Sequence, residues 1–218
     1  MLALRRDLPS RCTLFSQRGD GFTMRIRHAV LAGALAFPAV PLIAQRAEIP
    51  RPDTLGANFD HTVQGKGTPA DYDFLVGTWK FRYQARDPAS GNYSPPTVGE
   101  WTGKKPFGTL FFDEFVRMTP TGANPPIMTY RVFNRTKSDW EVQGVALQRG
   151  VWQPGVSWSD GKDRFLVQEN PERKTLVRIR YYSIEPNHFL WRADGSSDGG
   201  KTWMRDVMLI EATRTGQP

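Results

Sequence analysis

The fold of this chain is decided by one stretch, Asp71-Tyr72-Asp73-Phe74-Leu75-Val76-Gly77-Thr78-Trp79, which continues as Lys80-Phe81-Arg82-Tyr83. In an extended chain the aromatic residues Trp79, Phe81 and Tyr83 would share one face, and the polar residues between them would share the other. A period of two is typical of a half-buried strand. The stretch therefore predicts a short helical turn that leads, through Gly77, into the first strand of a sheet.

Nine further segments repeat this alternation, with Asn, Asp, Gly and Pro between them. The ten predicted strands are 79–84, 97–103, 109–118, 127–134, 139–147, 151–158, 163–169, 175–183, 188–194 and 202–213. Many short strands at near-regular spacing indicate an all-β barrel or sandwich, and sequential strands usually pair as hairpins. Closure also removes the exposed sheet edges that favour aggregation. We predict an all-β chain with a single antiparallel up-and-down barrel of about ten strands.

The beginning of the chain predicts export. A basic segment, Met24 to His28, precedes an apolar run from Ala29 to Ala44 that contains two prolines. This succession is typical of a secretory signal peptide, and the run is too short to cross a bilayer well. We expect residues 1–44 to be an upstream extension plus signal peptide with the real start at Met24, residues 45–70 a tether, and residues 71–214 the barrel. The expected location is secreted or periplasmic, in a bacterial envelope, with no transmembrane span after signal removal.

The charge of the chain does not indicate a nucleic-acid partner. The formal net charge is +7 and the isoelectric point is near 9.7. Residues 1–44 hold six arginines and two aspartates, so the rest of the chain keeps 23 basic and 20 acidic residues, a net charge of +3. No basic run survives in that remainder. Because phosphate backbones are bound by clustered basic side chains, we expect no nucleic-acid partner.

Cysteine and histidine are too scarce for a metal or thiol site. The single cysteine, Cys12, lies in the predicted leader, so the mature chain would have no disulfide and no thiolate nucleophile. Outside the leader the histidines are His61 and His188, and no spacing typical of metal ligands is present. We expect no metal and no cofactor, with haem held by His188 as a minor alternative.

Two motifs carry resemblances to known families. The stretch Phe74 to Trp79 resembles the opening of the calycins, the superfamily of lipocalins and fatty-acid-binding proteins. Together with Asp198-Gly199-Gly200-Lys201-Thr202-Trp203 it is similar to an uncharacterised bacterial family of calycin-like domains. The resemblance implies the barrel fold and a packing role for Gly77 and Trp79 beneath the turn.

Ser196 to Trp203 also resembles the Asp-box of sialidase blades. A single copy is physically a hairpin device, because a turn carboxylate accepts backbone hydrogen bonds and glycine tolerates positive φ. We expect a structural role for Asp198, Gly200 and Trp203.

Arginines on the strands are the candidate ligand-binding residues. Arg178, Arg180 and Tyr182 share one face of a predicted strand, and Val177, Ile179 and Tyr181 share the other. The Arg180–Tyr182 pair is similar to the Arg-x-Tyr pair that grips carboxylates in fatty-acid-binding proteins. Periodicity alone does not decide which face points inward, and we slightly favour the arginine face. The full candidate set is Arg178, Arg180, Tyr182, Arg131, Arg82 and Arg192.

Three classes of function remain open. The favoured one is an exported barrel that binds a small hydrophobic or amphipathic molecule, with an acidic group if arginines line the cavity. The second is an enzyme with a carboxylate acid or base at the barrel mouth, for which Asp113, Glu114 and Asp206 are the candidates. Catalysis stays open, and a function without catalysis is favoured. The third is a structural envelope protein with a filled barrel. The sequence identifies neither the ligand nor the oligomeric state.

Overall fold

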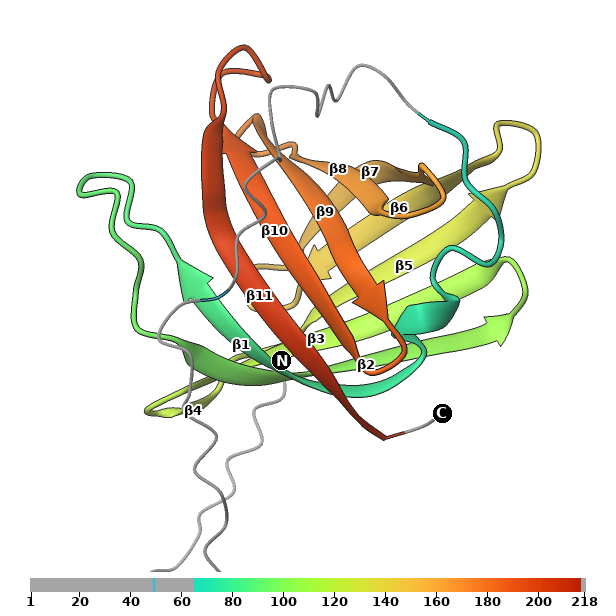
Figure 1. Ribbon diagram of the computed structural model, residues 1–218. Coiled ribbons are helices and arrows are strands. Elements are labelled where there is room, and N and C mark those ends of the chain that lie inside the picture. The colour runs from blue at the N-terminus through green and yellow to red at the C-terminus, as the bar shows by residue number, and fades with distance from the viewer. Residues whose placement is uncertain (1–48, 50–64, 217–218) are drawn as a thin grey trace, which may run out of the picture. The chain divides into compact units, whose positions relative to one another are not determined.

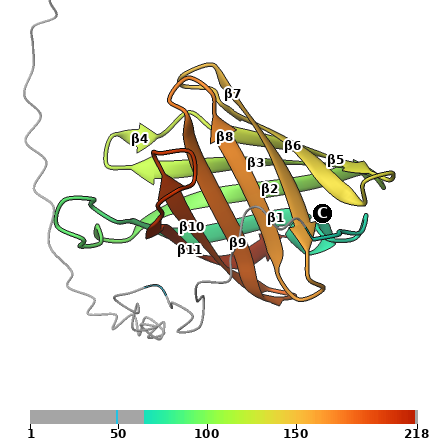
Figure 2. The same cartoon turned by 90° about the horizontal axis from the view of Figure 1, so that it is seen from above.

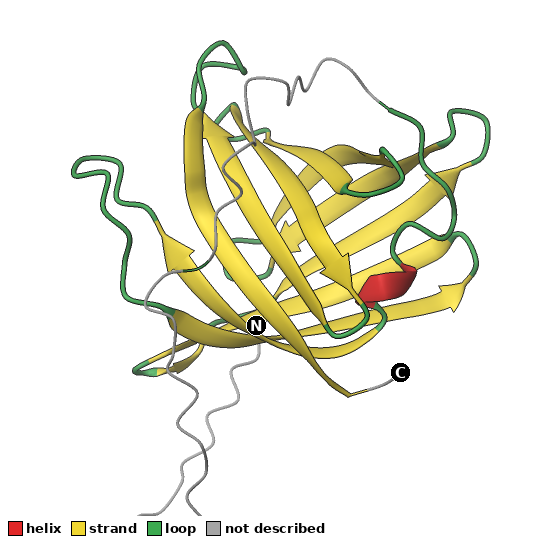
Figure 3. Cartoon of the chain, in the orientation of Figure 1, coloured by secondary structure: helices red, strands yellow, loops and turns green. Residues whose placement is uncertain are grey.

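A computed structural model describes Ile49 and residues 65–216. The predicted signal peptide, the start at Met24 and most of the predicted tether lie outside the described residues. The described chain has one 3-10 helix, η1 (Asp73–Leu75), and eleven strands (Figure 3). The strands are β1 (Gly77–Ala85), β2 (Thr97–Phe107), β3 (Leu110–Thr119), β4 (Gly122–Ala123), β5 (Ile127–Asn134), β6 (Asp139–Ala146), β7 (Val151–Ser159), β8 (Arg164–Asn170), β9 (Thr175–Glu185), β10 (His188–Ser196) and β11 (Met204–Gly216).

The strands form a closed antiparallel barrel, as Figures 1 and 2 show from two directions. Ten strands pair in the order in which they follow one another along the chain, and β4 only extends the edge of β3. The barrel closes through the pairing of β1 with β11, in which Trp79 lies opposite Arg214. The all-β class, the up-and-down topology and the turn before the first strand are therefore confirmed. Strand β4 was not predicted, because two residues are too few to show alternation.

Trp79 closes one end of the barrel. Its indole N–H donates to the Leu75 carbonyl of η1 at 3.1 Å, and its ring is fully buried. Arg214 comes from β11, and its guanidinium lies 4.1 Å from the centre of the Trp79 ring. The same guanidinium donates to the carbonyls of Val76 and Phe74 at 2.5 and 2.6 Å. Gly77 joins η1 to β1 at φ +110°, which an L side chain rarely adopts. The turn is thus fixed to both the first and the last strand.

Aromatic side chains fill the half of the barrel next to η1. Tyr72 lies at the centre of this layer, with the rings of Phe111 and Trp140 both 5.4 Å from its own. Phe189 continues the layer with edge contacts to Trp79 and Phe74. Edge and offset ring pairs add about 0.5–1.5 kcal/mol each beyond the apolar area they bury. This half of the barrel is a packed core.

The hairpin between β10 and β11 is held by Asp198, as predicted for a structural turn. Its carboxylate accepts the Thr202 N–H at 2.9 Å and the Thr202 hydroxyl at 2.7 Å. Gly199 and Gly200 have φ of +72° and +89°, and the Trp203 indole donates to the Gly200 carbonyl at 2.9 Å. Every polar group named here bonds within the turn, which supports a structural role.

A second apolar cluster lies on the outer face of the last strands. Tyr182, Leu190 and Leu209 pack there under Ile49, whose N–H donates to the Gln84 side chain at 3.0 Å. These strands are therefore buried on both faces, which weakens the alternation of polar and apolar residues. Among the described residues, the structure has no helix with the length and apolar character needed to cross a membrane.

Candidate functional site: an interior cavity

The half of the barrel away from η1 holds a cavity of about 300 Å³. Its wall is mainly aliphatic and aromatic, and its polar residues lie at the base and around the mouth. The residues that line it include Tyr83, Trp101, Asp113, Arg117, Arg131, Arg149, Leu166, Val177, Ile179, Tyr181, Trp191 and Ile210. Because η1 and the aromatic layer close the opposite end, the cavity opens at the end of the barrel away from η1.

A buried ion pair forms the base of the cavity. Arg131 on β5 donates through Nη1 to the Asp113 carboxylate on β3, and both side chains are 1 % exposed. The second Asp113 oxygen accepts the indole N–H of Trp101 at 2.9 Å. Arg131 also donates through Nη2 to the Tyr181 hydroxyl at 3.2 Å, and its guanidinium lies 4.5 Å from the centre of the Tyr72 ring. A buried charge requires this kind of pairing, because its desolvation is otherwise too costly.

Burial sets the electrostatics of the base. It raises the pKa of the Asp113 carboxyl, against the opposing effect of Arg131. Burial would lower the pKa of Arg131, but the charge and hydrogen bond of Asp113, together with Tyr181 and Tyr72, outweigh burial, and the pKa is raised. The pKa of the Tyr181 hydroxyl is also raised, by burial first and by Asp113. Two donors, from Arg131 and Trp101, converge on the Asp113 carboxylate and favour the ionised pair. The raised pKa of Tyr181 keeps its hydroxyl neutral.

Hydrogen-bond donors outnumber acceptors at the base. Within the described residues, Nε of Arg131 and the indole Nε1 of Trp191 are buried and have no hydrogen-bond partner. The Trp191 N–H lies close enough to the Tyr181 hydroxyl to lower its pKa, but it misses the geometry of a hydrogen bond. Buried donors without partners are rare in proteins. The base would therefore favour a guest that carries a hydrogen-bond acceptor, such as a carbonyl or ether oxygen.

Strand β9 has the orientation opposite to the one favoured from the sequence. Val177, Ile179 and Tyr181 line the cavity, whereas Arg178, Arg180 and Tyr182 lie on the outer face. The preference for an arginine-lined β9 is thus wrong about the direction of these side chains. Whether the outer arginines bind anything stays a prediction.

The outer arginines form an ionic network with carboxylates of neighbouring strands and turns. Arg178 pairs with Asp194 at 2.8 Å, and Arg180 donates to Asp163 at 2.5 Å. Arg192 contacts Asp194 at 2.5 Å and Asp206 at 3.1 Å. Asp163 and Asp194 are almost fully buried. These arginines and aspartates neutralise one another on the outside of the barrel, away from the cavity.

The remaining predicted residues are divided between the two faces. Arg131 lines the cavity, and Arg82 lies outside, where it pairs with Glu211 at 3.1 Å. Of the candidate catalytic carboxylates, Asp113 lies at the cavity base, Glu114 is exposed on the outer face, and Asp206 belongs to the outer network. Of the candidate arginines and catalytic carboxylates, only Arg131 and Asp113 line the cavity, whereas Arg192 and Asp206 meet on the outer face.

The structure gives no support to haem ligation by His188. This residue begins β10 at the closed end of the barrel, and its Nε2 lies 3.4 Å from the Glu211 carboxylate on the outer face. No histidine lines the interior cavity. Within the described residues, no group of three or more histidine, cysteine, aspartate or glutamate side chains could hold a metal ion.

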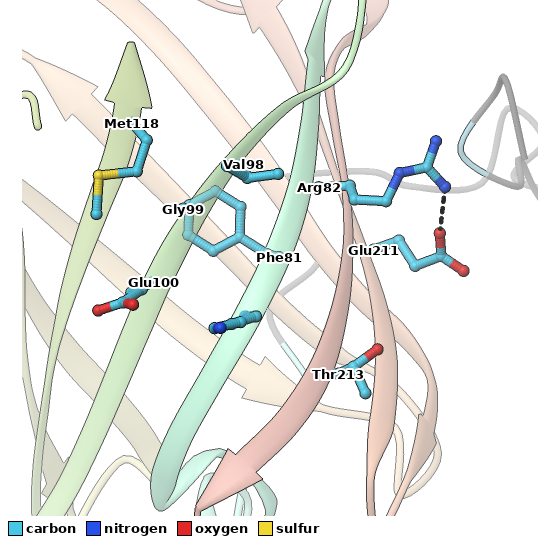
Figure 4. A pocket seen from close by; sticks show the side chains of 9 residues that line it. Phe81, Arg82, Val98, Gly99, Glu100, Met118, Glu211 and Thr213 are labelled. Carbon is cyan, nitrogen blue, oxygen red and sulfur yellow. Dashed lines mark hydrogen bonds and ion pairs between the residues drawn. The ribbon is translucent and has the colours of Figure 1, made fainter. Parts of the chain in front are cut away.

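A second hollow, of about 440 Å³, lies on the outer surface of β1, β2 and β11 (Figure 4). Its exposed rim includes Lys80, Val98 and Glu100, and the Arg82–Glu211 ion pair crosses one side. Its charged groups are already paired in part, and it is open to solvent, so we place the candidate site in the interior cavity.

Several lining residues were missed in the sequence. Trp101, Trp191, Arg117 and Arg149 line the cavity, but no local sequence pattern marks them as site residues. Arg117 lies near the end of a predicted strand and Arg149 lies in a turn. Arg117 and Arg149 lie at the same end of the barrel, because each stands near the end of a strand that runs toward the mouth. An up-and-down topology predicts this position once the strands are known.

Comparisons with known proteins agree with the barrel but do not identify a family. No family model matches the chain, and no curated protein matches it. The S-type phycobiliprotein lyase CPES from Guillardia theta has a similar structure, with a TM-score of 0.50 and 8% identity over 67% of this chain and 92% of that one. Rv2717c from M. tuberculosis is similar with a TM-score of 0.53 and 11% identity over 69% of this chain and 99% of that one. At such identities the likeness concerns the fold alone, and the chain is similar in fold to calycin-like ten-stranded barrels.

Proposed function

We propose that this protein binds one small, mostly apolar molecule inside the barrel. The observation that carries the proposal is the interior cavity itself, which has an apolar wall and a base with unpartnered buried donors. The two unpartnered donors, Nε of Arg131 and Nε1 of Trp191, belong to residues that line this cavity. Small-molecule sites commonly occupy barrel mouths and combine apolar walls with a few polar groups that fix the orientation of the ligand.

The volume limits the size of the molecule. About 300 Å³ is at the lower end of the range for small-molecule pockets, so we expect a ligand on the scale of a medium-chain lipid or a two-ring aromatic. Its acceptor group would meet the Trp191 N–H, while its apolar part would lie against Leu166, Ile179 and Ile210.

Binding can be tested with a neutral probe, decan-1-ol, and with the tryptophans of the cavity wall. Trp101 and Trp191 line the cavity, so an occupied cavity should change the intrinsic fluorescence, and native mass spectrometry should show a one-to-one complex. Val177→Phe narrows the cavity and should abolish binding. Val132→Phe is the matched control, since Val132 is 51% exposed on the outer face. Equal decanol binding by both variants would contradict the position proposed for the ligand, and a wild type that binds neither decanol nor decanoate would contradict the binding function.

We further propose that the chain is exported and belongs to the bacterial family of calycin-like domains suggested by Asp71 to Trp79 and Asp198 to Trp203. The support for export is the basic and apolar succession from Met24 to Ala44. N-terminal sequencing of protein from an exporting host should give a start near Gln45. A mature chain that begins upstream of Met24 would contradict this proposal.

A further inference from the structure

We propose that the mouth of the cavity recognises an acid group through Arg117 and Arg149, so that the ligand is an amphipathic carboxylate bound with its acid outward. This inference rests on the proposed binding function and adds the class of ligand. Arg117 lies on β3, and Arg149 lies in the turn between β6 and β7. Both line the interior cavity and also a neighbouring hollow of about 490 Å³ at the rim, so they stand where the two spaces join.

The charges of the two spaces favour an anion at the mouth. Four charged side chains line the interior cavity, namely Asp113, Arg131, Arg117 and Arg149. The first two form the buried pair at the base and cancel one another. The rim hollow adds no carboxylate. The mouth therefore has two positive charges with no negative side chain in the lining, and a cleft of one sign concentrates ligands of the opposite sign.

The two arginines at the mouth have no carboxylate partner, unlike several arginines elsewhere on the barrel. Within residues 65–216, neither Arg117 nor Arg149 forms an ion pair, whereas Arg131, Arg178 and Arg192 each contact an aspartate. The guanidinium of Arg117 lies 5.1 Å from the centre of the Tyr83 ring, which limits its motion and leaves its donors available. Arginine presents a planar fork of donors that matches a carboxylate, so these positions suit an acid better than lysines would.

The backbone holds Arg149 at the rim. The N–H groups of Arg149 and Gly150 both donate to the Ala146 carbonyl at 2.9 Å, and Gly150 has φ +66°. The turn is therefore defined by its own hydrogen bonds, while the Arg149 side chain is exposed. Arg117 is therefore held in place by the Tyr83 ring, whereas the Arg149 side chain extends from a tight turn into solvent.

An acid group bound at the base is disfavoured. The nearest cation there, Arg131, already pairs with Asp113, and a second carboxylate beside Asp113 would add a buried like charge. A ligand with its acid at the mouth avoids this cost and places its apolar chain against Ile179 and Ile210. The Trp191 donor is still available for a second, neutral acceptor on the ligand.

The test compares decanoate with decan-1-ol, which share the chain and differ in the charged head. Affinities are measured by calorimetry for the wild type, Arg117→Gln, Arg149→Gln and the double variant. Arg135→Gln is the matched control, because Arg135 is exposed in the turn between β5 and β6 at the closed end. We expect each single variant to lose about five- to tenfold in decanoate affinity, as for a partly exposed charge-assisted hydrogen bond. Decanol affinity should change by less than about twofold, since no charge is lost from its contacts.

Salt gives a second measurement. Raising the ionic strength should weaken decanoate binding by the wild type and should leave decanol binding unchanged, because exposed charges are screened. If decanoate and decanol bind equally well and the arginine variants change neither, the acid-recognition inference is wrong while the binding function stands. If neither probe binds the wild type, the binding function is wrong and this inference is wrong with it.

Discussion

Arg131 and Asp113 show how a barrel interior tolerates charge. Each is 1% exposed, and each gains a partner from a neighbouring strand together with a third group, Tyr181 or Trp101. Such a pair adds little net stability compared with apolar residues of the same size, but removal of one member leaves the other buried and uncompensated. The pair therefore determines which polar groups face the cavity. Its effect on the free energy of unfolding is large only when one member is removed.

This asymmetry gives a prediction. Asp113→Asn should lower the free energy of unfolding by about 3–5 kcal/mol, because the Arg131 charge stays buried without its counter-charge. The double variant Asp113→Leu, Arg131→Met should recover most of the loss, since neither charge is then present. Urea denaturation of the three proteins measures both effects. A loss below about 1 kcal/mol in Asp113→Asn would show that the pair is not ionised or not buried.

Asp198 predicts a dependence of stability on pH. Hydrogen bonds from Thr202 and Ser196 lower the pKa of its carboxyl to about 2, below the value of about 3.9 for an unfolded aspartate. A carboxyl with a lowered folded pKa contributes stability that is present above the unfolded pKa and is lost as the pH falls through the folded pKa. The wild type should therefore lose its advantage over Asp198→Asn between about pH 4 and pH 2. Glu172→Gln, at an exposed turn position, is the matched control and should show a smaller change.

At the scale of single elements, β9 shows where sequence analysis stops. Both faces of β9 carry residues that become buried. On the outer face Tyr182 is covered by Ile49, and Arg178 forms an ion pair with Asp194. The partners that decide the orientation come from other strands and from a segment more than a hundred residues earlier. Alternation along one strand cannot contain that information. In contrast, the ends of the ten strands were close to the predicted ones, because turn residues mark them locally.

Strand β2 also carries an element-level prediction. A Cβ atom added at Gly103 would lie 2.2 Å from the Leu75 carbonyl oxygen and 2.9 Å from the Phe111 ring. The backbone of η1 therefore packs directly on this glycine, and the 3-10 turn could not stay in place. Gly103→Ala should cost about 1–3 kcal/mol, as expected for overpacking. Gly108→Ala is the control, since nothing lies within 4 Å of its added Cβ atom. Equal unfolding midpoints for the two variants would contradict this account of the closed end.

At the scale of the whole molecule, the sequence predicts the strands and the closed barrel, but it does not predict the cavity inside the barrel. The number of strands and their order follow from local patterns, and hairpin pairing then leads to a barrel. The cavity depends on how ten strands share one interior, with the aromatic layer around Tyr72 packed near η1 and the cavity beyond that layer. The pairing of Thr78 with Gly216 brings the two ends of the barrel sequence together, and it is this contact that turns a list of strands into an enclosed space.

An enclosed space that binds a ligand should couple binding to the stability of the entire barrel. A ligand at one hundred times its dissociation constant stabilises the folded state by about 2.7 kcal/mol, provided that it does not bind the unfolded chain. For a barrel of this size that corresponds to a rise in the melting temperature of roughly 5–11 °C. Decan-1-ol should therefore raise the melting temperature of the wild type and of Val132→Phe but not of Val177→Phe.

The narrowed variant carries a second expectation, because a cavity kept for a ligand lowers the stability of the empty protein. Without ligand, Val177→Phe should unfold at a higher temperature than the wild type, with a gain of about 0.5–2 kcal/mol, as is common when a cavity is filled. Differential scanning calorimetry of the empty and loaded proteins measures both effects. If Val177→Phe is less stable than the wild type and decanol still raises its melting temperature, the phenylalanine does not occupy the cavity, and the position assigned to the ligand along β9 is wrong.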